Sequence, residues 1–236
     1  VQGDARVTVR RLIEASEPVG ERREWLQRVR QLVSEWRSEA AQWRDSDAAP
    51  MRPERICKEL SEWLPSDALV VADTGHAGIW TGTMLDMKHP GQGYIRCAGS
   101  LGWGFPASLG VKSAAPERPV VCFTGDGGFW YHIAELETAL RRGINTVTVV
   151  NNNHSLNQCK RGAERVYAGG PGNPDELWHF QDVDFARVAQ AIGCWGVRVT
   201  KPGELRSALE AALASGKPAV VDVASDIEAI APPPWG

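Results

Sequence analysis

The chain has 236 residues, of which 43% are hydrophobic and 23% are charged, and this mix is typical of a folded soluble protein rather than a disordered one. No apolar run approaches the ~20 residues that a membrane-spanning helix needs, which excludes an integral membrane protein. The net charge of −3 argues against nucleic acid as a partner, because a polyanion-binding surface would need an excess of basic residues.

The cysteines are few and scattered, and no two of them form a C-x-x-C pair. A disulfide framework or a zinc site would need clustered cysteines, so we expect free thiols and a cytoplasmic location. No secretory signal peptide is visible, and the sequence opens at Val1 within a polar, helix-like stretch. We therefore expect either a processed chain or the C-terminal piece of a longer one. The cysteines are Cys57, Cys97, Cys122, Cys159 and Cys194.

Residues 1–46 are rich in Arg and Glu and differ in composition from the rest of the chain. Between residues 22 and 44, apolar side chains recur at steps of three and four, which predicts one amphipathic helix. This stripe would either pack on its own domain or bind a partner. A polar linker at 45–50 follows, so we divide the chain into a helical segment, 1–46, and a domain, 47–236. The stripe consists of Trp25, Val29, Leu32, Trp36, Ala40 and Trp43.

From residue 51 onward, short β-branched runs alternate with helical segments. Strands without polar alternation, joined by helical crossovers, predict an α/β fold in which helices cover both faces of a parallel sheet. In such sheets, ligands bind outside the carboxyl ends of the strands. We expect strands at 68–72, 119–124, 146–150, 195–199 and 219–223, with helices at 133–142 and 205–214.

Two of these strand ends carry residues suited to phosphate and metal. Gly125-Asp126-Gly127-Gly128 follows one strand, where glycines let the backbone approach a ligand. Asn153 lies 27 residues beyond Asp126, at the end of the next strand. A carboxylate and an amide oxygen at one sheet edge suit Mg²⁺, which would bridge the protein and a diphosphate. The alternative is that Asp126 and Asn153 merely cap separate helices.

The run Gly125-Asp126-Gly127, a crossover and then Asn152-Asn153 resembles the thiamine-diphosphate motif of the acetolactate synthase-like enzymes. Residues 98–107 resemble the glycine-rich segment of that family, and residues 73–76 resemble its first diphosphate-side loop. Three motifs in the right order make the resemblance specific. It covers about residues 50–225 and implies the thiamine-diphosphate-binding fold.

The resemblance implies a role for each matching residue. Asp126 and Asn153 would ligate Mg²⁺, together with the backbone carbonyl of Ser155. The Gly99 carbonyl would accept a hydrogen bond from the 4′-amino group of the cofactor, and Leu101 would be an apolar wedge under the thiazolium. Leu101 and His76 are the implied catalytic residues. The implied cofactor-binding set is Gly75, His76, Ala77, Gly99, Ser100, Leu101, Gly125, Asp126, Gly127, Gly128, Asn153, Ser155 and Leu156.

Family members also use a glutamate from a separate N-terminal domain, usually across a subunit interface, and nothing in this chain matches that domain. The resemblance therefore implies a partner chain or missing half that supplies the pyrimidine-binding domain and the activating glutamate, in a dimer or tetramer. Residues 1–16 resemble the last helix of the family's middle domain, which supports a fragment. Flavin could enter only through parts outside this chain.

The remaining polar candidates are open to two interpretations each. His76 could touch diphosphate or substrate; His132, at the expected start of a crossover helix, and His154 are further candidates. Residues 154–158 depart from the pattern of biosynthetic synthases, which leaves the substrate open. We interpret as structural or solvent-exposed the side chains of His89, His179, Glu135 and Glu137.

The implied function is carboligation or decarboxylation of 2-oxo acids by an acetolactate synthase-like enzyme. A 2-hydroxyacyl-CoA or benzaldehyde lyase is the alternative, because the same motifs serve both. A non-catalytic cofactor-binding subunit would be expected to lose Asp126 or Asn153, and both are present. A nicotinamide-dependent oxidoreductase fails on the missing G-x-G-x-x-G pattern.

Overall fold

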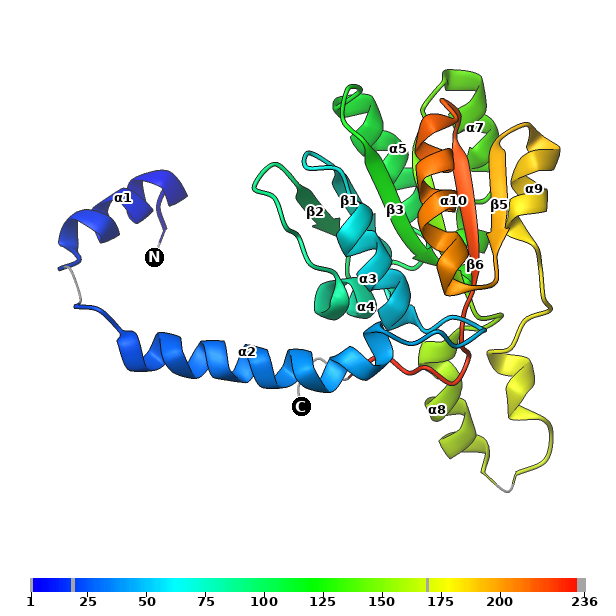
Figure 1. Cartoon of the computed structure of the whole chain (residues 1–236), viewed down its shortest axis with the longest axis horizontal. Helices are drawn as coiled ribbons and strands as arrows, with labels where there is room; N and C mark the ends of the chain where they lie inside the picture. Colours follow the sequence, from blue (N-terminus) through cyan, green and yellow to red (C-terminus); the bar gives the residue numbers. More distant parts are fainter. Residues whose placement is uncertain (1, 18–19, 169, 233–236) are drawn as a thin grey trace. The chain divides into compact units, whose positions relative to one another are not determined.

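The computed structural model describes residues 2–17, 20–168 and 170–232 (Figure 1). The chain divides into two units, Val1–Ala41 and Gln42–Gly236, each of which we describe by itself. The boundary falls within the second helix, a few residues before the division at residue 46 expected from the sequence. That division stays a prediction.

The first unit is helical. Helix α1 spans Ala5–Ala15, and its N-terminus is capped by Asp4, whose Oδ1 accepts a hydrogen bond from the backbone N–H of Val7 at 2.9 Å. Helix α2 spans Arg23–Arg44, as the spacing of its apolar residues predicts. The apolar stripe of α2 is exposed except at Ala40.

A six-stranded parallel sheet, in the order β2-β1-β3-β4-β6-β5, forms the centre of the second unit. The sequence prediction of a parallel sheet is therefore confirmed. It missed β2 because this edge strand is short and alternates between half-buried and exposed residues, unlike the buried strands beside it. The strands are β1 Leu69–Ala72, β2 Gly93–Arg96, β3 Val120–Gly125, β4 Val147–Asn152, β5 Trp195–Val199 and β6 Ala219–Ala224.

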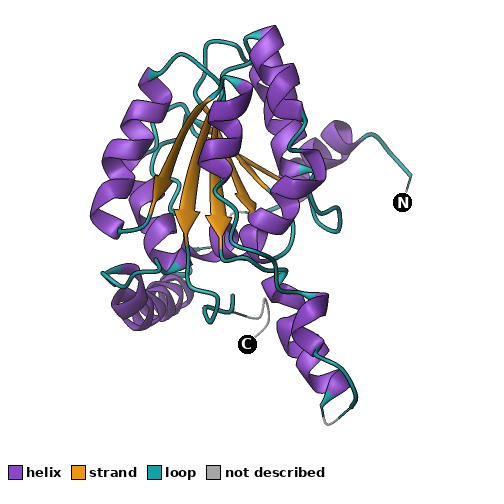
Figure 2. Cartoon of the chain, turned by 90° about the vertical axis from the view of Figure 1, so that its right-hand side faces the viewer, coloured by secondary structure: helices purple, strands orange, loops and turns teal. Residues whose placement is uncertain are grey.

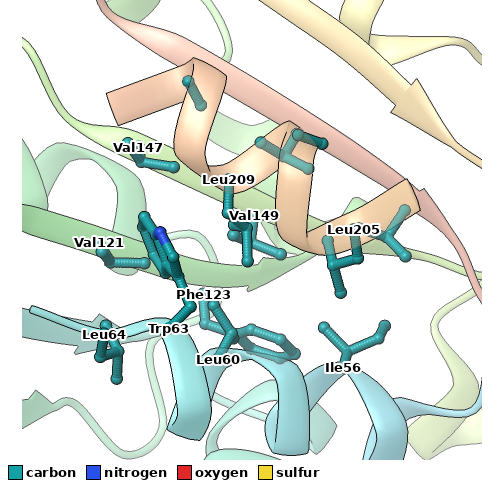
Figure 3. Packing of buried hydrophobic residues seen from close by; sticks show 14 of the residues in the cluster. Ile56, Leu60, Trp63, Leu64, Val121, Phe123, Val147, Val149, Leu205 and Leu209 are labelled. Carbon is teal, nitrogen blue, oxygen red and sulfur yellow. The ribbon is translucent and has the colours of Figure 1, made fainter. Parts of the chain in front are cut away.

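Helices cover both faces of this sheet, as Figure 2 shows. On one face, α3 (Pro53–Trp63), α4 (His76–Met84) and α10 (Pro202–Ala214) pack against the strands. There Leu60 and Leu209 meet strand residues such as Phe123 (Figure 3). On the other face lie α5 (Gly104–Ala114), α6 (Asp126–His132), α7 (Glu135–Arg142) and α9 (Phe185–Ile192). The two buried cores use alternate residues of β3, β4 and β6, so these strands are continuous apolar runs in the sequence.

The helix expected at 133–142 is present as α7, but sequence analysis missed a separate helix, α6, directly before it. The structure has α6 beginning directly at Asp126, at the end of β3, and ending at His132, before α7 begins at Glu135. His132 thus ends a helix instead of starting one. The glycines after Asp126 suggested a loop from propensity alone, but burial of Phe129 in the core keeps this segment helical.

Strand order reverses direction between β1 and β3, which places a topological switch point at their carboxyl ends. Helix α8, Asn157–Tyr167, follows β4 and lies beyond this edge of the sheet (Figure 1). A short 3₁₀ turn, η1, spans Pro174–Leu177 and packs against α8. The segments that follow β1, β3 and β4 therefore meet at one edge.

Two further sequence expectations concern the whole chain. The five cysteines are all unpaired, and Cys57, Cys122 and Cys194 are buried. None of the described helices combines the length and the apolar character that crossing a bilayer requires.

Candidate functional site

A pocket with a cavity volume of about 100 Å³ lies at the switch point. One side, which we call the strand-loop wall, consists of residues 74–77, Leu101 and residues 125–128. The other side, the α8 wall, consists of residues 151, 153 and 155–159. All of the residues that sequence analysis assigned to the cofactor line this pocket, except Gly99 and Ser100, which are exposed on the adjoining loop.

Asp126 belongs to the strand-loop wall and is only 2% exposed. Its Oδ1 accepts a hydrogen bond from the backbone N–H of Gly127 at 2.7 Å, and its Oδ2 accepts one from the N–H of Ser155 at 2.9 Å. Burial raises the pKa of the Asp126 carboxyl to about 7, although these backbone donors oppose the shift. A carboxylate buried to this extent suits a divalent ion, because the ion would offset the cost of burying its charge.

The segment after β4 brings its oxygen atoms close to Asp126. Asn153 is 5% exposed, and its Oδ1 accepts a hydrogen bond from the Ser155 hydroxyl at 2.8 Å. His154, between them, adopts a φ of 57°, a left-handed conformation that is uncommon outside glycine. This turn is held by the bond from Ser155 to Asp126, so that the two strand ends are joined at the pocket.

The glycines after Asp126 are required by close packing. A Cβ at Gly128 would lie 2.6 Å from Asp73 Oδ2, and one at Gly127 would lie 2.5 Å from Leu156 Cδ2. The N–H of Gly127 donates to the carboxylate of Asp126, and the place of Gly127 in the cofactor-binding set stays a prediction. The arrangement brings backbone close to the pocket, as the glycine-rich motif predicts.

Asp73 is a structural residue whose role the sequence analysis missed. It is fully buried, and its Oδ1 accepts hydrogen bonds from the N–H groups of Thr74 (2.7 Å) and Gly102 (3.1 Å). Its Oδ2 accepts one from the Thr124 hydroxyl at 2.9 Å. The Thr74 hydroxyl in turn accepts a bond from the N–H of Gly99 at 2.9 Å. The loop that carries Leu101 is therefore held on both sides.

Of the histidines, only His76 lines the pocket. It is half-buried, and its Nδ1 has no hydrogen-bond partner among the described residues. Burial, with a smaller contribution from the charge of Arg161, lowers the pKa of His76 to about 4, so the imidazole is neutral near pH 7. His132 is exposed outside the pocket lining.

The remaining polar candidates lie outside the pocket lining. His154 Nδ1 lies 3.5 Å from Asp182, and burial lowers the pKa of His154. Glu137 pairs with Arg141 on the surface of α7. His89 and His179 are solvent-exposed, as expected.

The α8 wall holds amides that sequence analysis did not single out. Asn151 and Asn157 are 4% and 5% exposed, and the Oδ1 atom of each has no hydrogen-bond partner in the part of the chain that the structure describes. Gln158 and Cys159 line the same wall. The run of three asparagines at 151–153 could have indicated this polar wall. We expected the strand to end at residue 150, and we assigned a role only to Asn152 and Asn153.

Behind this wall, Asp222 on β6 holds the neighbouring asparagine. Its Oδ1 accepts a hydrogen bond from Asn152 Nδ2 at 2.9 Å, and its Oδ2 accepts one from the N–H of Phe185 at 2.9 Å. Asp222 is fully buried, and burial raises the pKa of its carboxyl to about 6. Arg198 approaches it at 3.9 Å. This network fixes the end of β4 next to the pocket.

The oxygen atoms of this pocket suit a hard cation that is shared with a diphosphate. The turn after β4, which donates to Asp126 through the Ser155 N–H, carries the side-chain oxygens of Asn153 and Ser155, and Mg²⁺ prefers oxygen ligands. Among the described residues no group of three or more His, Cys, Asp and Glu could hold a metal. The site therefore matches a cation shared with a phosphate ligand better than an all-protein metal cage.

The family model of the thiamine pyrophosphate enzymes, describing their C-terminal TPP-binding domain, matches residues 73–223. This match spans more than half of the chain and includes both walls of the pocket. The chain belongs to the thiamine pyrophosphate enzymes. The identification drawn from the three sequence motifs is confirmed, and with it the thiamine-diphosphate-binding fold.

Curated relatives place the chain close to one branch of this family. It is 32% identical over 222 residues to the acetolactate synthase isozyme 3 large subunit of Escherichia coli K12, covering 90% of this chain and 37% of the relative. It is 40% identical over 184 residues to an acetolactate synthase large subunit of Mycobacterium tuberculosis, covering 76% and 32%. The acetolactate synthase large subunit of Haemophilus influenzae is 31% identical over 199 residues, covering 83% and 34%. The chain thus spans about a third of the length of these relatives.

Proposed function

We propose that this chain is the diphosphate-side part of a thiamine-diphosphate- and Mg²⁺-dependent enzyme that forms or cleaves a C–C bond next to the carbonyl of a 2-oxo acid. An acetolactate synthase-like carboligation or decarboxylation is the reaction proposed. The observation that carries it is the pairing of buried Asp126 with Asn153 in one pocket at the switch point, within a chain of this family.

The residues divide the work of holding the cofactor. Asp126, Asn153 and the Ser155 carbonyl would hold Mg²⁺ against the diphosphate, with backbone from Gly128 beside them. Leu101 would support the thiazolium from below, on a loop that Asp73 anchors. When bound, thiamine diphosphate supplies a nucleophilic carbon and an electron sink. The protein supplies orientation, which is where proximity lowers the barrier.

The backbone loops complete the cradle. Gly75, His76 and Ala77 would face the diphosphate from the N-terminus of α4, where free N–H groups suit an anion. Gly99 would offer its carbonyl to the 4′-amino group, with Ser100 alongside. His76 is neutral near pH 7, so it would act as a hydrogen-bonding group rather than as a cation.

The proposal includes a second polypeptide or chain segment that supplies the pyrimidine-binding half and the activating glutamate, in a dimer or tetramer. Its support is that the chain covers about a third of the relatives it matches. Flavin would enter only through such parts. A cytoplasmic location belongs to the proposal as well, in keeping with five unpaired thiols.

The test is a calorimetric titration of thiamine diphosphate into the complete enzyme that contains this chain, with and without Mg²⁺. We expect binding that depends on the metal, and a loss of at least about 100-fold in affinity, or about 3 kcal/mol, for Asp126→Ala. Circular dichroism checks that the variant is folded. Binding that is equally tight without metal, or unchanged in the variant, would remove Asp126 from the metal site.

A lyase acting on 2-hydroxyacyl-CoA or a benzaldehyde-type adduct would use the same cofactor site. Assaying the enzyme with 2-oxo acids, both pyruvate and 3-hydroxypyruvate, and with a 2-hydroxyacyl-CoA separates the two reactions. A cofactor-binding subunit without activity would bind thiamine diphosphate and turn over neither. The presence of both Asp126 and Asn153 in one pocket favours an active site.

A further inference from the structure

Asn157 is the first residue of α8, directly after the turn that follows β4, and its carboxamide is fixed in orientation. Its Nδ2 donates a hydrogen bond to the backbone carbonyl of Ile227 at 2.5 Å. This bond uses the amide nitrogen within the protein and fixes which way the carboxamide is turned. Asn157 is also one of the residues that line the pocket. The oxygen, Oδ1, is buried and unpartnered among the described residues. A buried acceptor without a donor lowers stability, so a bound group should satisfy it.

The chemistry of the missing donor is restricted. A diphosphate presents oxygen acceptors, which cannot donate to Asn157 Oδ1, and a metal ion would be held by Asp126 and Asn153. Around Asn157 the α8 wall continues with Gln158 and Cys159, so its first helical turn offers polar side chains to the pocket. A purely aliphatic substituent would leave the acceptor unsatisfied. An O–H or N–H group is needed.

We propose that the substrate is a 2-oxo acid carrying a hydroxyl or amino group close to its carbonyl, and that Asn157 recognises this donor. This inference rests on the proposed function and names the substrate class of that site. Asn151, on the same wall, has a second oxygen without a partner, but none of the described residues holds its amide by a hydrogen bond, so it can present either oxygen or nitrogen. Recognition is therefore assigned to Asn157.

The test compares pyruvate with 3-hydroxypyruvate, which share a carbon skeleton and differ by one hydroxyl. In the complete enzyme we expect kcat/KM for 3-hydroxypyruvate to exceed that for pyruvate by at least about 100-fold, because a site built to bind a hydroxyl rejects the analogue without it. Asn157→Leu, of similar size, should lower this ratio at least about tenfold, since the acceptor is lost.

Asn145→Leu is the matched control. Asn145 also donates from Nδ2 to a backbone carbonyl, that of Gly216 at 2.7 Å, but it lies outside the pocket lining. Its substitution should leave the substrate ratio unchanged. If Asn157→Leu does not fold, as judged by circular dichroism, Asn157→Ala takes its place.

Each outcome decides the inference. A ratio near one in the wild type overturns it, as does turnover of neither substrate by an enzyme that acts on another 2-oxo acid. A high ratio that Asn157→Leu leaves unchanged assigns recognition of the substrate hydroxyl to water or another residue and also overturns it. Failure to bind thiamine diphosphate, or to act on any 2-oxo acid, would instead overturn the proposed function.

Discussion

The two walls of the pocket differ in where their polar atoms find partners. In the strand-loop wall, the carboxylate of Asp126 accepts hydrogen bonds from the protein at both oxygens, as does that of Asp73, which lies beside the wall and anchors its loops. In the α8 wall, the amide oxygens of Asn151 and Asn157 have no partner among the described residues. His76 Nδ1 is an exception on the strand-loop side.

This difference indicates a division of labour. Internal hydrogen bonds fix the position of a loop before a ligand arrives, which favours a rigid platform for a cofactor. Unpartnered buried atoms are costly in the empty pocket and are satisfied by a ligand, which favours selection of a substrate. The strand-loop wall would therefore contribute mainly to stability and positioning, and the α8 wall mainly to recognition.

The largest effect is expected at Asp73. Asp73→Ala leaves three donors, from Thr74, Gly102 and Thr124, without their acceptor, and we expect the free energy of unfolding to fall by about 4 kcal/mol. Asp73→Asn retains one acceptor oxygen and an amide that can donate to Thr124, so about 1 kcal/mol should be lost. Urea titrations measure both. Equal losses would show that the loop is not held by this carboxylate.

A second test concerns what the held loop does. Leu101→Ala removes the apolar side chain that Asp73 and Thr74 position, and turnover of the complete enzyme should fall about 100-fold, or about 3 kcal/mol, with a much smaller change in cofactor affinity. Leu156→Ala, on the α8 wall, is the matched control and should slow turnover less. A loss confined to cofactor binding in Leu101→Ala would contradict the positioning role.

A third test asks whether the α8 wall is also anchored, from behind, by Asp222. Its pKa of about 6 exceeds the ordinary 3.8, so the folded chain binds this proton more tightly, and the Asp222 contribution to stability grows as the pH falls through 6. Between pH 7 and pH 4.5 the wild type should gain about 2 kcal/mol relative to Asp222→Asn. Parallel curves of unfolding free energy against pH for the two proteins would contradict the assignment.

Sequence patterns predicted those parts of the site in which residue type follows from local geometry. The close approach of Gly127 and Gly128 and the strand-end positions of Asp126 and Asn153 depend on neighbours along the chain and on one crossover. Asp73, by contrast, matters because Gly102 and Thr124 come from two other segments. Such a long-range hydrogen-bond network leaves no periodicity in the sequence.

The same reasoning accounts for what was missed in the fold. The apolar runs of β3, β4 and β6 were evident because both faces of these strands are buried. The edge strand β2 has no such run. The helical state of residues 126–132 depends on the burial of Phe129 and not on local propensity, which glycines lower.

The smallest expected effect has the opposite sign from the first and separates the two walls most directly. Asn151→Leu replaces a buried amide, whose oxygen has no partner among the described residues, by an apolar group of similar size, and we expect the ligand-free chain to gain about 1 kcal/mol of unfolding free energy. Its neighbour Asn152 is the control, because its amide donates to Val183 O and Asp222 Oδ1, so Asn152→Leu should lose stability.

Chemical denaturation of the two variants, without cofactor or metal, measures both changes. Opposite signs at adjacent positions of one strand would mean that the polar character of Asn151 serves a ligand and not the fold. A loss of stability in Asn151→Leu as large as that in Asn152→Leu would mean that the α8 wall is held together as firmly as the strand-loop wall, and the division of labour between them would fail.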